Sequence, residues 1–357
     1  MKKLSKPIQI KDEQLQLIEK LSNACGIAGQ ENEIRKIVLE EIKAYADDVR
    51  VDAMGNVLAI KKAKQAGAMK VMVAAHMDEI GFLITKEDDD GLYNFTTVGG
   101  IDKRTILGKV VSIGKEHIQG IIGARPIHLT TAEERTQTIQ LEQLRIDTGI
   151  GKNAKVQAGD LATYATKFEH FGQTIRGKAL DDRLGVANLI QCLKHAPAHI
   201  EFQAVFTVQE EIGGRGAKTA AFALNPDVAF VLDVTPSNDM PAQPGEENIQ
   251  YNTHAGMGPA LYVADAATLS DPRLIRFVME VAEANKIPFQ IRQPGSGGTD
   301  AGSIHKTREG IPAVSMSVPC RYIHSAIGIA RVSDWENTLN LILAVLQNCD
   351  PAILNRN

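Results

Sequence analysis

The sequence predicts an α/β fold: a mostly parallel mixed sheet flanked by helices, with an inserted small all-β barrel domain. In the first and last parts of the chain, short runs rich in Val, Ile and Phe alternate with segments of helical spacing, as in a buried parallel sheet. Between about residues 79 and 169, closely spaced extended segments are typical of a barrel or sandwich. We therefore expect a discontinuous α/β domain, residues 1–78 and 170–357, interrupted by a β-barrel-like domain, residues 79–169.

The elements expected in the α/β domain follow from hydrophobic periodicity, and those of the insertion from short apolar runs separated by glycines or charges. In the insertion we expect strands at 80–85, 92–97, 109–113, 118–122 and 161–166, and one helix-like stretch at 131–144. In the α/β domain we expect helices over 11–46 with a break at 26–29, a hairpin over 48–60 turning at Gly55–Asn56, strands at 71–75, 202–208, 228–232, 289–292 and 314–318, and helices at 183–195, 274–285 and 335–349.

Composition excludes several classes of function. The 357 residues are 44% hydrophobic and 23% charged, which is ordinary for a globular protein and enough for two domains. A net charge of −4 and a pI near 6.2 indicate neither a nucleic-acid partner nor an anionic membrane surface. No signal peptide or membrane span is evident. Four scattered cysteines predict free thiols in a reducing, cytoplasmic environment.

Four apolar runs lead into residues that bind metals in proteins. The carboxyl ends of parallel strands meet at one edge of a sheet, where ligands bind in open α/β folds. Two histidines and several carboxylates are therefore expected to gather there. In chain order, the runs lead to His76, Glu210–Glu211, Asp233 and His324, and Asp233 is expected at the end of its strand.

Two further acidic positions join this set. Asp78 lies two residues after His76, and a metal-bound imidazole usually donates its other N–H to a carboxylate, so Asp78 is a candidate to orient His76. Asp181 and Asp182 stand where a helix is expected to begin. The ordinary role of an aspartate there is to cap the helix, and the functional alternative is to bridge two metals. The residues alone leave open which aspartate does which.

Glu210 and Glu211 are the strongest local signal. They follow an apolar strand directly, and burying a charge without a partner is costly. Neighbouring strand residues point to opposite sides, so we expect different roles for the two glutamates. One would bind metal, and the other would face the substrate as a general base.

This set of residues predicts a dinuclear metal site. Two histidines and three carboxylates suit two divalent cations such as Zn, Co or Mn. A pair of metals ~3.5–4 Å apart can lower the pKa of a water toward ~7 and polarise a carbonyl. The expected chemistry is amide hydrolysis without a covalent intermediate, because neither Ser303 nor Cys320 has an evident His–carboxylate arrangement.

The sequence resembles the tetrahedral-shell aminopeptidases, a family of cobalt- or zinc-dependent peptidases that includes glutamyl and deblocking aminopeptidases. The resemblance covers nearly the whole chain. The blocks 208–217 and 321–325 together are highly specific for the family, and the blocks 75–82, 98–102, 177–183, 285–290 and 298–301 add to them.

The resemblance implies a role for each site residue. Asp181 would bridge the metals, with Asp182 as the alternative, Glu210 would be the catalytic base and Asp78 would orient His76. The loop Gly298–Thr299–Asp300 would lie near the substrate. The implied metal ligands are His76, Asp181, Glu211, Asp233 and His324.

The resemblance also implies an architecture and an assembly. A zinc-peptidase-like catalytic domain, residues 1–78 and 170–357, would carry a dimerisation domain, residues 79–169. Six such dimers would form a hollow, twelve-subunit homo-oligomer that admits short peptides.

Two alternative functions and three further questions stay open. The alternatives are another dinuclear amide hydrolase, either a deacylase or a carboxypeptidase, and a non-catalytic, metal-stabilised oligomeric shell. The physiological metal, the choice between dimer and dodecamer, and the preferred N-terminal residue are not determined by the sequence. Arg292, Arg321 and Lys103 are candidate partners for an acidic substrate side chain.

Overall fold

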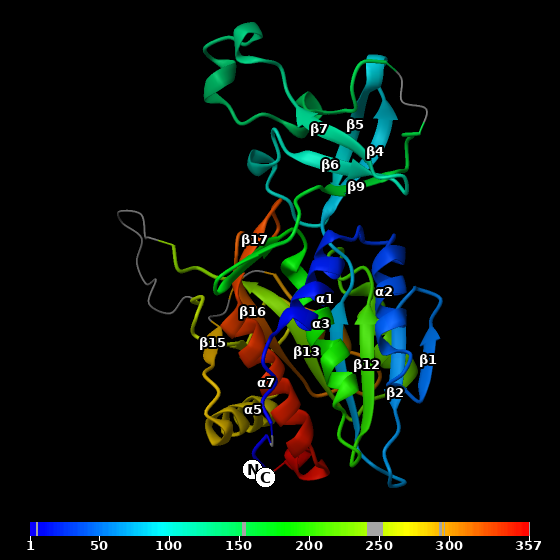
Figure 1. Ribbon diagram of the computed structural model, residues 1–357, viewed down its shortest axis with the longest axis vertical. Coiled ribbons are helices and arrows are strands. Elements are labelled where there is room, and N and C mark those ends of the chain that lie inside the picture. The colour runs from blue at the N-terminus through cyan, green and yellow to red at the C-terminus, as the bar shows by residue number, and fades with distance from the viewer. Residues whose placement is uncertain (5, 152–154, 241–252, 293–294, 296, 357) are drawn as a thin grey trace.

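The computed structural model describes residues 1–357 except 5, 152–154, 241–252, 293–294, 296 and 357. Figure 1 shows a large α/β body, which holds both ends of the chain, and a smaller body of β-strands beyond one end of it. Within the described residues, a mixed sheet flanked by helices carries a closed six-stranded barrel. The fold class expected from the sequence is therefore confirmed.

The large sheet has a parallel centre. Four strands lie side by side there, and nearly all of their residues are buried, as expected when helices cover both faces. In order they are β12 (Glu201–Thr207), β3 (Lys70–His76), β13 (Val228–Pro236) and β16 (Ala313–Arg321). Antiparallel strands extend the sheet on both sides. Beyond β12 lie β2 (Val57–Lys61) and then β1 (Asp48–Val51), and beyond β16 lie β17 (Gly328–Arg331), β11 (Thr174–Gly177) and β10 (Glu169–Phe171). A short strand, β14 (Ala260–Tyr262), also pairs with β16, and β15 (Gln290–Arg292) pairs with β14.

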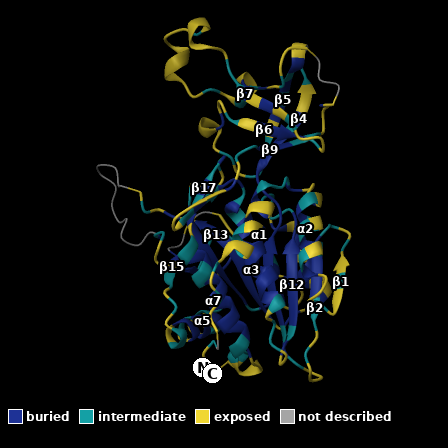
Figure 2. Cartoon of the chain, viewed as in Figure 1, coloured by how far each residue is buried: buried dark blue, intermediate teal, exposed yellow. Residues whose placement is uncertain are grey.

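Helices cover both faces of this sheet because side chains alternate along each strand. Val71, Val73 and Ala75 of β3 belong to the core on one face, and Met72 and Ala74 belong to the core on the other. Figure 2 shows the sheet as the most deeply buried layer of the α/β body. The first face packs against α1 (Asp12–Asn23), α2 (Asn32–Ile42), α3 (Leu180–Lys194), α5 (Pro272–Asn285) and α7 (Val332–Asn348), and the second against α4 (Arg215–Leu224) and α6 (Ala301–Ile304).

The barrel has a core of its own. The Phe82 ring lies edge-on to the rings of Phe95 and Tyr164, each at 5.3 Å between centroids. Closure of the barrel leaves no strand edge within it open to pairing. In spatial order its strands are β4 (Gly81–Glu87), β5 (Leu92–Val98), β8 (Arg145–Asp147), β7 (Ile118–Gly123), β6 (Val110–Ile113) and β9 (Leu161–Tyr164).

A buried ion cluster lies where the barrel meets the α/β body. Glu79 follows β3 on the way to the barrel, and Lys178 lies between β11 of the large sheet and α3; Lys178 Nζ lies 2.8 and 2.9 Å from the two Glu79 oxygens. Thr163 of the barrel donates to Glu79 at 2.6 Å, and an Arg183 nitrogen lies 3.3 Å from the same carboxylate. Removing one partner of a buried pair costs about 3–5 kcal/mol, so this cluster fixes the junction.

The prediction of a helix-like stretch at 131–144 is wrong. The structure has only two single turns of 3₁₀ helix there, Glu134–Thr136 and Leu141–Gln143, followed by β8. Most of residues 131–143 are exposed, so they have no neighbouring surface against which to bury an apolar stripe. Helices this short are marginal in water without such packing.

The expected hairpin is confirmed. Strands β1 and β2 pair antiparallel, with Val51 opposite Val57 and Gly55 in the turn at a φ of 102°. The break expected near residue 26 is also present, because α1 ends at Asn23 and α2 begins at Asn32. In the described part of the chain, no helix is both long and apolar enough to cross a membrane.

Candidate metal centre

The five expected metal ligands meet at the carboxyl edge of the central strands. His76 ends β3, Glu211 follows β12, and His324 follows β16. Asp233 was expected at a strand end, and that placement is wrong, because β13 continues to Pro236. Pairing of β13 with β3 ends at Val231, opposite Ala74, so Asp233 lies two residues beyond this pairing, beside His76 at the end of β3.

Asp181 and Asp182 lie differently with respect to the other candidate ligands. Asp182 Oδ1 accepts the Gly185 N–H at 2.9 Å, as a helix cap does, and its Oδ2 accepts the His76 N–H at 3.2 Å. Asp181 points into the site, with Oδ1 3.3 Å from His76 Nε2 and Oδ2 3.6 Å from His324 Nε2. The peptide bond between the two aspartates is cis.

The ligand atoms form two groups that share one residue. In each group the three candidate ligand atoms lie within 4.8 Å of one another. His76 Nε2 is also 3.7 Å from Asp233 Oδ1, and His324 Nε2 is 3.6 Å from Glu211 Oε2. The first group is His76, Asp181 and Asp233, and the second is Asp181, Glu211 and His324.

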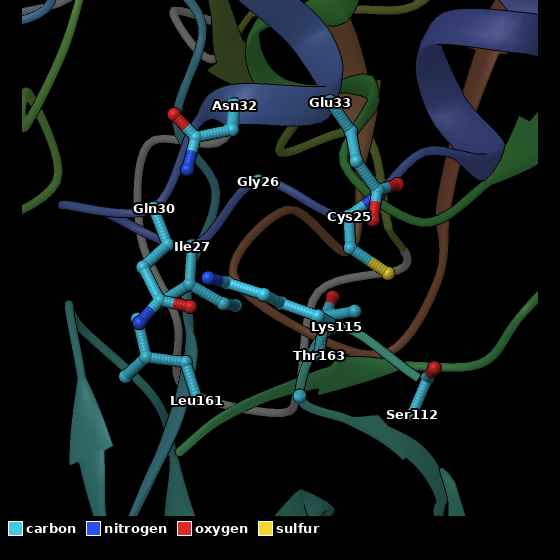
Figure 3. Close-up of a pocket in the computed structure, with 11 residues that line it drawn as sticks. Cys25, Gly26, Ile27, Gln30, Asn32, Glu33, Ser112, Lys115, Leu161 and Thr163 are labelled. Atoms are coloured by element: carbon cyan, nitrogen blue, oxygen red, sulfur yellow. The ribbon is translucent and has the colours of Figure 1, made fainter. Parts of the chain in front are cut away.

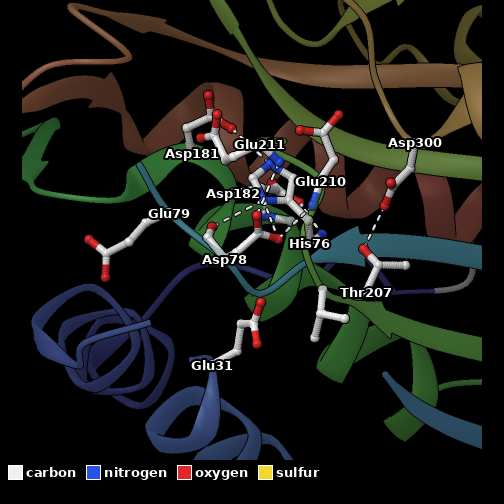
Figure 4. A network of polar contacts seen from close by, with 12 residues as sticks. Glu31, His76, Asp78, Glu79, Asp181, Asp182, Thr207, Glu210, Glu211 and Asp300 are labelled. Atoms are coloured by element: carbon white, nitrogen blue, oxygen red, sulfur yellow. Dashed lines mark hydrogen bonds and ion pairs between the residues drawn. The ribbon is translucent and has the colours of Figure 1, made fainter. Parts of the chain in front are cut away.

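Asp78 holds the adjacent glutamates. Its carboxylate accepts the N–H groups of Glu210 and Glu211 at 2.9 and 3.0 Å (Figure 4). The Asp78 carboxylate lies 3.8 Å from His76 Nδ1, too far for a hydrogen bond. The ring nitrogen instead faces the main-chain oxygen of Asp78 at 3.1 Å. Asp78 therefore orients His76 through its backbone and the glutamates through its side chain.

The two glutamates differ in direction for a reason other than strand alternation. β12 ends at Thr207, and both glutamates lie in the turn that follows, where the Glu210 carbonyl accepts N–H groups from Gly213 and Gly214. Figure 4 shows Glu211 beside Asp181, and Glu210 on the other side of the His76 ring. Glu211 thus belongs to a ligand group, whereas Glu210 stands next to it.

A barrel residue orients the second histidine. His324 lies in the left-handed region with φ 57°, and its Nδ1 lies 2.8 Å from the carbonyl oxygen of Gly100, just after β5. A Cβ on Gly100 would lie 3.2 Å from the imidazole, so a side chain there would crowd the ring. The sequence did not predict this contact, although Gly100 lies within one of the blocks of family resemblance.

Burial dominates the electrostatics of the site. It raises the pKa of Glu210 well above its ordinary value, that of Glu211 to about 8 and that of Asp233 to about 6. Burial alone would lower the pKa of His76, but hydrogen bonds to Asp181 and Asp233, together with the negative charges of Glu210 and Asp182, raise it well above its ordinary value. For the three carboxyl groups the main cause is burial, which disfavours a charge held away from water.

The residues fit two divalent cations. Their ligand atoms are imidazole nitrogens and carboxylate oxygens, the set that Zn²⁺ and Co²⁺ accept. In the described ion pairs of this cluster, the carboxylates face only two basic side chains, His76 and His324. The carboxylates outnumber these two histidines, so their negative charge is not fully balanced. Bound cations would supply the missing positive charge, and Asp181 is placed to contact both.

A cleft of about 510 Å³ opens beside these groups. The three candidate specificity residues differ in their position relative to this cleft. Arg292 lines the cleft, with Nε 3.0 Å from Thr235 Oγ1. Arg321 also lines it but pairs with Asp239 at 2.7 Å, and this pairing lowers the Asp239 pKa to about 2. Lys103 does not line the cleft; it is exposed on the barrel, donating to Gln140.

Asp300 has a place that the sequence did not specify. It is buried near Glu210, and its Oδ2 accepts the Thr207 hydroxyl at 2.5 Å (Figure 4). Its Oδ1 has no hydrogen-bond partner among the described residues, and burial raises its pKa to about 7. The sequence signal was the 298–301 block, but only the fold places Asp300 behind the end of β12.

Comparison with known proteins agrees with this geometry. The M42 glutamyl aminopeptidase family model matches residues 55–341. An aminopeptidase candidate of Acetivibrio thermocellus is 37% identical over 340 residues, covering 94% of this chain and 99% of its own. The structure of a TET aminopeptidase from a marine sediment archaeon of the Thaumarchaeota superposes with a TM-score of 0.90, at 32% identity over 96% of this chain and 99% of that one. The Pyrococcus horikoshii TET1 peptidase, which can assemble into a tetrahedron or a large octahedral shell, superposes with a TM-score of 0.81, at 33% identity over 93% and 98% of the two chains. The chain belongs to the M42 glutamyl aminopeptidase family.

Proposed function

We propose that the protein is an aminopeptidase that removes N-terminal residues from short peptides at a dinuclear metal centre. The observation that carries this proposal is the sharing of Asp181 between two ligand groups beside Glu210, a half-buried carboxylate that lines the same cleft. His76, Asp181 and Asp233 would hold one cation, and Asp181, Glu211 and His324 the other. When bound, Zn²⁺ or Co²⁺ ions, or Mn²⁺ as a further option, polarise a carbonyl and acidify a water.

Glu210 is the proposed general base. It lines the cleft together with the ligands but belongs to neither ligand group. Its carboxylate would accept the proton of the attacking water and deliver it to the leaving amine. Asp78, which accepts the Glu210 N–H, would keep this carboxylate in position during both transfers.

The free amino terminus of the peptide would be held near the metals and carboxylates of the cleft. Glu210 lines this space without being a proposed metal ligand, so its carboxylate keeps a charge that attracts an ammonium group. A blocked amine loses this attraction. The distinction separates an aminopeptidase from the other amide hydrolases that the same chemistry allows.

The test is turnover of aminoacyl anilides, with N-acetylated anilides and C-terminally free peptides as matched substrates. Chelator-treated protein would be measured with and without added Zn, Co or Mn. We expect cleavage that returns with metal and requires a free amine. Cleavage of acetylated substrates instead would identify a deacylase, and removal of C-terminal residues would identify a carboxypeptidase.

A matched variant separates catalysis from metal binding. Glu210→Gln should retain metal content and oligomeric state but lose turnover, because an amide cannot accept the proton. Glu19→Gln, on the exposed face of α1, is the control and should behave as wild type. Full turnover in Glu210→Gln would refute the assigned base and favour a metal centre that stabilises an oligomeric shell.

The barrel is the proposed dimerisation unit. We divide the chain into a catalytic domain, residues 1–78 and 170–357, and a barrel domain, residues 79–169, which would build dimers and then a twelve-subunit shell. Support comes from the shell formed by the P. horikoshii relative and from the separate barrel core. Mass measurement in solution, with and without metal, tests both assembly steps. The free thiols of all four cysteines support a cytoplasmic location.

A further inference from the structure

A second group of possible metal ligands lies outside the cleft, where the barrel meets the α/β body. It consists of Cys25, just after α1, Glu33 in α2, and His117 in the turn between β6 and β7 of the barrel. One ligand atom from each residue lies within 4.8 Å of the other two. Two of these residues thus come from one body and the third from the other.

The three side chains face one another closely. Cys25 Sγ is 3.4 Å from His117 Nδ1, and Glu33 Oε1 is 3.0 Å from His117 Nε2. The Cys25 N–H donates to the second Glu33 oxygen at 2.9 Å and so fixes that carboxylate. The fixed carboxylate and the tight turn that carries His117 leave these groups little freedom to separate.

A cavity of about 220 Å³ gives an ion access to this group. Cys25, Glu33, Ser112 and Lys115 line it, and Figure 3 shows the Cys25 sulfur next to the Glu33 carboxylate at one side of the space. No lining residue of this cavity lines the cleft of the dinuclear centre. A cation held here would therefore occupy a separate site.

We propose that Cys25, Glu33 and His117 bind a third transition-metal ion, Zn²⁺ or Co²⁺, which ties the barrel to the α/β body. Thiolate, imidazole and carboxylate are all ligands of Zn²⁺. Zn–S and Zn–N bonds of about 2.3 and 2.0 Å in tetrahedral geometry place the two ligand atoms roughly 3.5 Å apart, close to the separation of Cys25 from His117. The fourth position would face the cavity and hold water.

A thiol, an imidazole and a carboxylate in this order could also form a nucleophilic relay. Such a thiol is activated by a lowered pKa. Burial, together with the negative charges of Glu79 and Glu33, raises the pKa of Cys25 instead. Without a cation this thiol is a poor nucleophile, whereas a bound cation would supply the positive charge that stabilises the thiolate as a ligand.

The ion would act as a bond between the two bodies. Metal that binds the folded chain and not the unfolded chain stabilises it by mass action. Because His117 moves with the barrel, release of the ion would free one contact between barrel and sheet. The dinuclear centre uses no residue of this site.

Cobalt spectroscopy tests the proposal, because the ligands of the dinuclear centre include no thiolate. Chelator-treated protein would be titrated with Co²⁺ while near-ultraviolet absorption and bound metal are measured. We expect three bound ions per chain and a thiolate-to-cobalt charge-transfer band. Cys25→Ser and His117→Asn should each lose the band and one ion; Asn is suited to position 117 because it tolerates a positive φ.

Three controls make the result specific. Cys320→Ala should keep the band, which matters because Cys320 lies close to Asp181 in another small cavity. Cys192→Ala, buried in α3, and His128→Asn, exposed on the barrel, should keep both the band and the third ion. Two bound ions without a charge-transfer band in the wild-type protein, or a band that survives Cys25→Ser, would overturn the proposal.

Discussion

The carboxylate of Asp182 lies against Gly185, with Oδ1 accepting the Gly185 N–H at 2.9 Å. A Cβ at position 185 would come within 2.3 Å of that oxygen, so only glycine fits beneath the aspartate. This contact caps α3 and frees the neighbouring Asp181 to face the metal site. Gly185 therefore controls the shape of the site without lining it.

We expect Gly185→Ala to displace Asp182 and to weaken metal binding. Crowding a well-packed position costs about 1–3 kcal/mol. The measurement is the free energy of unfolding together with metal affinity. Gly123→Ala, at the end of β7 with open space around the added Cβ and no positive φ, is a comparison for a glycine outside the site. Unchanged metal affinity in Gly185→Ala would show that the Asp182–Gly185 contact does not influence metal binding.

The two aspartates should respond differently to substitution. Asp181→Asn should lose metal from both positions, because both groups share this carboxylate. Asp182→Ala should instead lose about 1–3 kcal/mol of stability, since the buried N–H groups of His76 and Gly185 lose their acceptor. Metal analysis and denaturant unfolding check the pair. Loss of metal in Asp182→Ala alone would identify Asp182 as the bridging ligand.

Removing the Asp78 side chain should reduce catalysis more than binding. Asp78→Ala leaves the N–H groups of Glu210 and Glu211 without their acceptor, so both carboxylates lose their fixed direction. Groups that orient metal-site residues typically contribute 10–100-fold to activity or metal affinity, and we expect a kcat loss of about that size. Steady-state kinetics at saturating metal would measure it. Asp78→Asn, which keeps one carbonyl acceptor, should recover part of the loss.

Arg292 should set the preference for acidic N-terminal residues. Its guanidinium lies over the Tyr262 ring, 4.5 Å from the ring centroid, and Arg292 lines the same cleft as the candidate metal ligands. Arg292→Gln should lower kcat/KM for glutamyl anilide roughly tenfold or more, the value of a charged hydrogen bond, and change leucyl anilide little. Arg321→Gln is the matched control, because Arg321 already pairs with Asp239. Equal losses for both substrates would exclude a specificity role.

The metal-free protein should lose stability as pH rises. The pKa of Asp233 is raised to about 6 and that of Glu211 to about 8, chiefly by burial, whereas both are near 4 in an unfolded chain. The folded state therefore binds more protons than the unfolded state in this window. The contribution is fully present below about pH 4 and is lost progressively as pH rises to about 8.

Thermal unfolding of chelator-treated protein between about pH 5 and 8 tests this dependence. Bound metal should remove most of it, because cations stabilise the ionised carboxylates that burial disfavours. Metal uptake at neutral pH should accordingly release protons, which calorimetry in buffers of different ionisation enthalpy would detect. A pH-independent Tm in the metal-free protein would contradict the expectation.

The sequence predicted the parallel core because its strands are buried on both faces. Runs such as 71–75 are apolar throughout, as expected for a strand buried on both faces, and the strand ends at His76. The same reasoning misplaced Asp233, since the end of an apolar run need not be the end of a strand. The extension of β13 depends on pairing with β16, up to Pro236 opposite Cys320, and a single run carries no information about its neighbour.

Other features depend on contacts between distant segments. The helix-like spacing at 131–144 had no partner surface, and spacing alone does not show whether one exists. The different placement of Asp181 and Asp182 depends on a helix turn and on the main chain of His76, more than a hundred residues away. The group of Cys25, Glu33 and His117 was not predicted, because three residues scattered over two bodies form no motif.

The hydrogen bond from His324 Nδ1 to the Gly100 carbonyl oxygen links the barrel to the proposed metal centre. His324 belongs to the α/β body, yet the carbonyl that sets the direction of its ring comes from the end of β5. A truncated chain without the barrel would keep every proposed ligand and still lack the angle at which one of them is presented. Any rotation of the barrel, including one imposed by a neighbouring copy, would turn that imidazole and change the affinity of the site it serves. Assembly through the barrel, as proposed, would therefore affect metal binding through the Gly100 carbonyl group.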